Sequence, residues 1–151
     1  MIDKMTHKES TKTLTDHYIG HLAYLHGDTP YIVPVTYYYD TSENAIISYS
    51  GEGHKIKAMR ANQSVAFQIE NIESLNNWMS VLVHGTFEEL NGSAAKMYLH
   101  KFAQHVKNLM ARQKGIDTKA IDSFSSKINS GNIPIVYRIN VQDIIGRQRT
   151  S

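Results

Sequence analysis

The chain has 151 residues, of which 41% are hydrophobic, so it is long enough for a single domain with a substantial core. Its net charge of +2 comes from 16 basic and 14 acidic residues, and the basic residues are scattered, which argues against a nucleic-acid-binding groove. The absence of cysteine excludes disulfide scaffolds, thiolate zinc sites and cysteine nucleophiles.

Residues 1–17 form a polar N-terminal segment. Its beginning lacks the apolar core of a secretory signal, and no later stretch approaches the roughly 20 apolar residues of a membrane span. We therefore expect a cytoplasmic protein, folded as one domain over residues 1–151, that binds neither membranes nor nucleic acid.

Three short alternating runs predict the first three strands. The first run begins near Tyr18 and ends at His26, the second covers 31–39, and the third covers 45–50, with turn-forming residues between them. Pro34 lies inside the second run. Because proline cannot donate to a sheet ladder, it indicates an edge, a bulge or a place where something other than a strand faces the backbone.

A short helix is expected over 55–61, followed by strands over 65–70 and 78–90. In the longer of these strands Val81, Val83 and Phe87 share one face. Gly85 interrupts the strand, and this predicts a bulge or the close approach of another backbone.

Two helices are expected over 93–130, the first capped by Ser93 and the second by Asp117, before a sixth strand over 135–141. This order does not alternate as a parallel β-α-β sheet requires. The sequence therefore predicts a mainly β fold, a six-stranded antiparallel barrel with a helix pair inserted before the last strand. Closure of the barrel or dimerisation would remove the sheet edges.

The stretch with the most suggestive chemistry is Ser48-Tyr49-Ser50-Gly51-Glu52-Gly53-His54-Lys55, where a strand gives way to a helix. Its hydroxyls can donate to phosphate oxygens, its glycines allow backbone N–H groups to approach closely, and the helix start adds positive charge. The alternative is an ordinary strand-to-helix turn whose lysine faces solvent.

Five stretches in order resemble the FMN-binding split-barrel superfamily of pyridoxamine 5′-phosphate oxidase-like proteins, and within it the branch of 5-nitroimidazole-resistance proteins. They span about residues 18 to 149, and no single one is diagnostic. The stretches are Gly20-His21-Leu22-Ala23, Pro30-Tyr31-Ile32-Val33-Pro34-Val35-Thr36-Tyr37, Gly53-His54-Lys55-Ile56, Trp78-Met79-Ser80-Val81 with Gly85, and Val136-Tyr137-Arg138-Ile139 with Gly146-Arg147.

This resemblance implies a homodimer with two FMN sites at the subunit interface. It places the isoalloxazine ring along the backbone of one strand and the phosphate at the following strand and turn. Two further residues would lie near the flavin, contributed by the other subunit. The ring-binding residues would be Val35, Thr36 and Tyr37, the phosphate-binding residues Ser48, Tyr49, Ser50, His54 and Lys55, and the two further residues Trp78 and Ser80.

The chain also departs from the family pattern. Ser48 stands where many relatives of the nitroimidazole-resistance branch carry a histidine, and His84 stands where arginine often precedes the glycine. The pyridoxamine phosphate-binding residues of the true oxidases have no clear counterpart. The resemblance therefore does not imply a vitamin B6 oxidase, and it identifies no catalytic side chain.

The function expected from this resemblance is an FMN-dependent oxidoreductase that reduces small electron-poor substrates of the nitroaromatic or quinone type with electrons from NAD(P)H. One alternative is a non-catalytic protein that stores or senses FMN, and another is a haem-binding member of the same superfamily. The eight histidines lack metal-ligand spacing, so no metal site is expected. Tyr37, Tyr38 and Tyr39 could include a proton donor or serve only to pack the barrel.

Overall fold

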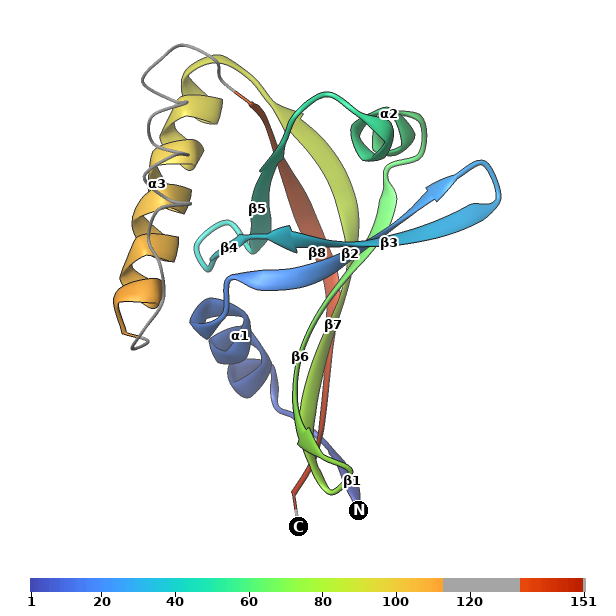
Figure 1. Ribbon diagram of the computed structural model, residues 1–151, viewed down its shortest axis with the longest axis vertical. Coiled ribbons are helices and arrows are strands. Elements are labelled where there is room, and N and C mark those ends of the chain that lie inside the picture. The colour runs from blue at the N-terminus through green and yellow to red at the C-terminus, as the bar shows by residue number, and fades with distance from the viewer. Residues whose placement is uncertain (113–133, 151) are drawn as a thin grey trace.

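The computed structural model describes residues 1–112 and 134–150. Strands dominate it, and three helices lie around them (Figure 1). The predicted helix capped by Asp117 lies outside the described residues. The elements are β1 (Ile2–Lys4), α1 (His7–Asp16), β2 (Ile19–His26), β3 (Thr29–Thr36), β4 (Tyr38–Asp40), β5 (Ala45–Ser50), α2 (His54–Ala61), β6 (Ser64–Ser74), β7 (Asn77–Leu90), α3 (Gly92–Ala111) and β8 (Ile135–Arg149).

The strands form one antiparallel sheet in the order β3-β2-β6-β7-β8-β5-β4, and β1 pairs with β8. The two ends of this path, β3 and β4, are consecutive in the chain and separated only by Tyr37. The same stretch of chain therefore pairs with β2 on one side and with β5 on the other, which closes the sheet into a barrel.

The predicted mainly β antiparallel barrel is confirmed, although the strand count of six is wrong and the sheet has eight strands. The predicted second strand is divided at Tyr37, whose N–H donates to the Tyr18 carbonyl (2.8 Å) while its ring enters the core. The additional strand is β1, which comes from the segment that the sequence analysis treated only as polar.

The barrel interior is filled by the alternating side chains that the sequence pattern predicts. Val81, Val83 and Phe87 of β7 are all buried, as expected. Leu14 of α1 joins this core from one end of the barrel, and the Tyr37 hydroxyl donates to its carbonyl (2.7 Å). Helix α1 begins with a capping box between Thr6 and Glu9, a helix-start signal that the sequence contains.

A second core lies outside the barrel, where α3 packs on β5 and β8 (Figure 1). Ala45 and Ile47 of β5 belong to it, whereas Ile46 belongs to the barrel interior, so β5 is buried on both faces. Helix α3 begins at Gly92 with Asn91 as its N-cap, two positions earlier than the cap predicted at Ser93 for the first of the two helices.

Gly85 fulfils both parts of its prediction. The pairing of β7 with β8 shifts register between His84 and Gly85, and a Cβ atom at Gly85 would lie 2.5 Å from the Asn140 carbonyl oxygen. Glycine is therefore required where β7 and β8 come closest. Among the helices of the described residues, none is long and apolar enough to cross a membrane.

Candidate functional site

A hollow of about 370 Å³ lies where β5 ends and α2 begins. It contains the glycine-rich turn that the sequence predicts to bind phosphate, together with side chains from the β2–β3 hairpin. This arrangement brings residues from positions 24 and 33 against the turn at 50–55. The lining residues are Tyr24, Val33, Ser50, Gly51, Glu52, Gly53, His54 and Lys55.

Lys55 supplies the positive charge of this hollow. Its side chain is half-buried, and it forms no ion pair with any residue that the structure describes. Burial lowers the pKa of its ammonium group, because desolvation disfavours the charged form. A bound anion would compensate this cost.

The start of α2 adds backbone donors next to Lys55. Gly53 is the N-cap of this helix and has no side chain that could accept a hydrogen bond from the first-turn amides. Helix N-termini with unsatisfied amides favour anions. The amide end of α2 and the Lys55 ammonium therefore act on the same side of the hollow.

One carboxylate, that of Glu52, also lines the hollow. Arg60 binds it through Nη1 and binds Glu89 through Nε (2.7 Å). Because the guanidinium lies between the two carboxylates, the charge of Glu52 is partly neutralised and its side chain is held in place. Glu52 therefore leaves Lys55 as the unpaired charge in the hollow.

Only part of the predicted phosphate-binding set lines the hollow. Ser50, His54 and Lys55 do, and the Ser50 hydroxyl donates to the Gly51 carbonyl (2.7 Å). Ser48 is buried and donates to the Thr36 carbonyl (2.7 Å), and the Tyr49 ring lies edge-on against Phe102 of α3. The alternation of β5 directs these two side chains to the barrel interior and to the second core.

Strand β3 passes beside the hollow with one edge free of strand pairing. The Tyr37 N–H faces β2, where it donates to Tyr18 (2.8 Å), and strand alternation turns the amide of Val35 the same way. Thr36 faces the opposite side, where its carbonyl accepts from Ser48, and so does Pro34. The prediction that Pro34 marks an edge is confirmed, because β3 is the first strand of the sheet path.

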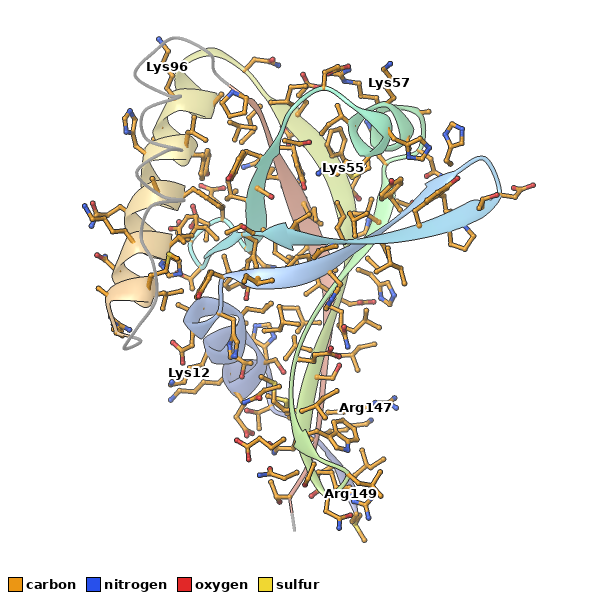
Figure 2. All side chains as sticks on the ribbon, viewed as in Figure 1. Lys12, Lys55, Lys57, Lys96, Arg147 and Arg149 are labelled. Atoms are coloured by element: carbon orange, nitrogen blue, oxygen red, sulfur yellow. The ribbon has the colours of Figure 1, made fainter. Side chains whose placement is uncertain are left out.

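The remaining predicted residues, Trp78 and Ser80, lie away from Lys55 within the same chain. Trp78 pairs with Ile72 and Arg149 at the end of the barrel where Arg149 is labelled in Figure 2, whereas Lys55 is labelled beside α2 at the opposite end. One chain therefore does not bring the predicted fifth-strand residues to the hollow at 50–55.

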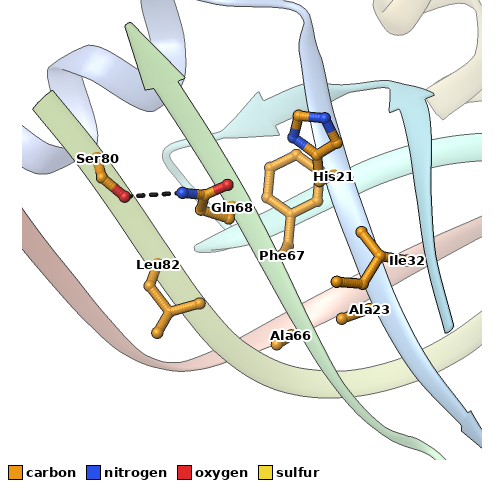
Figure 3. A pocket seen from close by; sticks show the side chains of 8 residues that line it. All are labelled: His21, Ala23, Ile32, Ala66, Phe67, Gln68, Ser80 and Leu82. Carbon is orange, nitrogen blue, oxygen red and sulfur yellow. Dashed lines mark hydrogen bonds between the residues drawn. The ribbon is translucent and has the colours of Figure 1, made fainter. Parts of the chain in front are cut away.

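Ser80 lines a second hollow, of about 290 Å³, on the outer face of β2, β6 and β7 (Figure 3). Gln68 donates to the Ser80 hydroxyl (2.9 Å), and Ala23 and Ala66 form a shallow floor between the strands. His21 contributes an imidazole at the margin. This surface was not predicted from the sequence. Most of its members occupy strand positions that alternate with buried ones, so the alternation of the strands would have predicted them.

The outer face around this hollow carries no helix of the described chain, and exposed apolar side chains lie there beside polar ones such as Gln68 and Ser80. Ile32 is 70% exposed, and Ile72 and Ile145 are also exposed. These residues occupy outward positions on β3, β6 and β8, so they share one side of the sheet with Ala66 and Leu82. Several exposed apolar side chains on one side of a sheet are typical of an interaction surface.

Other titratable groups of the described residues give weaker indications of a functional site. No group of three or more histidine, aspartate or glutamate residues is placed to hold a metal ion within residues 1–112 and 134–150. Tyr37 is fully buried and burial raises the pKa of its phenol, which fits a packing role for this tyrosine. Burial also raises the pKa of Tyr137 to about 12.

Residues 6–148 match the protein family described as pyridoxamine 5′-phosphate oxidase. An uncharacterized protein of Rhizobium meliloti is 29% identical over 130 residues, which cover 85% of this chain and 83% of that protein. The resemblance inferred from the five sequence stretches is confirmed at the level of the family.

Two solved structures share the fold. A FAD-binding protein from Mesorhizobium loti is 25% identical, with a TM-score of 0.75 and 99% of each chain covered. A candidate 5-nitroimidazole antibiotic resistance protein from Bacteroides thetaiotaomicron is 15% identical, with a TM-score of 0.62, covering 98% of this chain and 87% of the other. The second similarity concerns the fold alone.

Proposed function

Because the chain belongs to the pyridoxamine 5′-phosphate oxidase family, we propose that it is a flavin-dependent oxidoreductase that binds FMN and reduces small electron-poor organic molecules, such as nitroaromatics or quinones, with electrons from NAD(P)H. The observation that carries the proposal is the unpaired, half-buried Lys55 at the amino end of α2. The similarity to the FAD-binding protein of Mesorhizobium loti supports a flavin as the cofactor.

The residues around the hollow fit a flavin phosphate. Lys55 and the first-turn amides of α2 supply charge and donors, and Ser50 can exchange its bond to the Gly51 carbonyl for one to a phosphate oxygen. Ser48 contributes by a different route from the one expected, because its hydroxyl holds the Thr36 carbonyl and so fixes the position of β3.

The free edge of β3 fits the polar side of the isoalloxazine ring. Thr36 presents its N–H on this edge, and Pro34 presents a carbonyl without a competing donor. The amides of Val35 and Tyr37 face β2 instead, so their part in the site is to hold the strand in place. A rigid strand edge with alternating donors and acceptors suits the ring nitrogens and oxygens of a flavin.

We further propose a homodimer, in which the outer face of β2, β6 and β7 lies in the interface. The exposed Ile32, Ile72 and Ile145 supply the apolar area, and Ser80 and Trp78 would reach the flavin of the partner. The separation of Trp78 from Lys55 within one chain supports this arrangement.

The flavin would supply the redox chemistry by accepting a hydride equivalent from the nicotinamide and passing electrons to the acceptor. The protein holds the phosphate at Lys55 and the ring edge at Thr36. The contribution of the chain that the hollow supports is the positioning of the flavin and the substrates.

The experiment that tests this function is the absorption spectrum of the purified protein before and after incubation with FMN and removal of the excess, followed by NADPH and NADH oxidation assays with a quinone and a nitroaromatic. Retention of about one flavin per subunit and many turnovers of an acceptor support the proposal. Tight flavin retention without turnover would indicate a binding protein instead, and rejection of flavin would remove the proposal.

A further inference from the structure

A cluster of four rings adjoins the hollow at 50–55 and extends beyond it along the β2–β3 hairpin. Its members come from the β2–β3 hairpin and from the first residue of α2. Tyr24 and His54 also line the hollow, so the cluster and the hollow are continuous. The four residues, here called the ring cluster, are Tyr24, His26, Tyr31 and His54.

The backbone places these rings together. Tyr24 and Tyr31 are direct partners in the pairing of β2 with β3, and their rings stack with centroids 5.5 Å apart and planes at 10°. His54 lies 4.8 Å from Tyr31 and 4.7 Å from His26, and its Nδ1 is 2.9 Å from the Tyr24 hydroxyl. The rings therefore hold one another in fixed positions.

The ring cluster is open to solvent although it is preorganised. His26 and His54 are exposed and Tyr31 is 38% exposed, whereas Tyr24 is buried beneath them. The β2–β3 hairpin that carries three of the rings extends outward beside α2 (Figure 1). A fixed, exposed aromatic surface can stack a flat heterocycle at little cost in side-chain entropy.

The order of the sites along β3 indicates which heterocycle the ring cluster binds. Tyr31 belongs to the ring cluster, Val33 lines the hollow, and Thr36 marks the free edge beside the proposed flavin ring. These positions span about 17 Å at the rise of a β-strand. The hollow that suits a phosphate therefore lies between two surfaces that suit flat rings, which is the order of groups in a flavin dinucleotide.

Resting on the proposed function, we propose that the ring cluster binds the adenine of FAD, with the diphosphate at Lys55 and the first turn of α2. The dinucleotide would then be the preferred cofactor over FMN. The adenine packs against Tyr31 and His26, whose planes lie at 74° to each other, so that a flat base can stack on one ring and meet the edge of the other. Lys55 serves both phosphates because no carboxylate of the described residues pairs with it.

The test is a pair of titrations of flavin-free full-length protein, one with FMN and one with FAD. Binding is monitored by the change in flavin fluorescence. We expect FAD to bind at least about tenfold more tightly than FMN, as one stacked base allows. Tyr31→Ala should remove most of that preference while changing FMN affinity by less than about threefold. Tyr31→Phe retains the ring and should keep the preference.

His26→Ala gives a second, independent variant at an exposed position, and it should reduce the preference for FAD in the same direction. Unaltered FMN binding reports that each variant is folded. Equal affinities for the two flavins, or a preference that survives both alanine substitutions, would overturn the assignment and leave the proposed function intact. Binding of neither flavin would remove the proposed function as well.

Discussion

Replacement of Lys55 by alanine should weaken flavin binding and stabilise the flavin-free protein. Both effects follow from a half-buried ammonium group that has no carboxylate partner among the described residues. Burial lowers its pKa, so at neutral pH the charged group is less favourable in the folded state than in the unfolded chain. A phosphate would reverse that balance.

The size of the binding effect follows from the contact that is lost. A hydrogen bond to a charged group contributes about 1.5–3 kcal/mol, equivalent to roughly 10- to 150-fold in Kd. Because Lys55 is only half-buried, solvent screens part of this interaction, so we expect a value near the lower end, about tenfold. Lys55→Met should preserve the apolar stem and give a similar loss.

The assay is flavin titration by fluorescence at two salt concentrations, with thermal unfolding of the flavin-free protein measured in parallel. Lys57→Ala is the matched control, because Lys57 is an exposed residue of the same helix (Figure 2) and should alter Kd by less than about threefold. An equal loss in both variants would indicate a general charge effect. Unchanged affinity in Lys55→Ala would refute the phosphate assignment.

Three further predictions concern stability. Gly85→Val should lower the free energy of unfolding by about 1–3 kcal/mol or more in urea denaturation, since its side chain would meet the backbone of β8, whereas Gly51→Ala meets nothing within 4 Å and should be nearly neutral. Phe102→Ala should cost about 3–5 kcal/mol, because this ring is buried between α3 and the sheet; a loss below about 1 kcal/mol would contradict that packing. Hydrogen bonds from Asn140 and Arg138 lower the pKa of Glu88, so the stabilising contribution of its charge is present above the unfolded pKa and is lost as the pH falls through the folded value. Glu88→Gln should therefore lose less stability than the wild type on acidification, and an identical pH profile would exclude this contribution.

Local sequence patterns determined most of the strands. The alternation in β7 predicted its buried face and its bounds to within one residue, because a side-chain period of two survives any arrangement of the strands. The turn-forming residues before position 45 helped to predict the bounds of β5. Gly85 was predicted correctly for the same reason, as a residue without a Cβ inside a long strand signals a close approach. The capping box is another local signal, since Thr6 and Glu9 are three residues apart, and this spacing predicts where α1 begins.

The composition of the sites was decided by tertiary structure. Ser48, Ser50 and Lys55 are close in sequence, but Ser48 lies within the barrel and is buried, whereas Ser50, on the same face at the end of β5, lines the hollow together with Lys55. Sequence spacing could not reveal that α3 covers the outer face of β5, and therefore could not predict where Tyr49 points.

The sequence by itself determined that this chain is mainly β and antiparallel, and where its candidate phosphate-binding turn lies, because both depend on periodicity and on residues that are adjacent in the chain. Only the tertiary structure decided that Tyr24 and Val33 meet residues 50–55, that four rings gather beside them, and that Trp78 lies at the other end of the barrel. Such contacts depend on strand order and barrel closure, which join segments far apart in the chain and leave no local pattern.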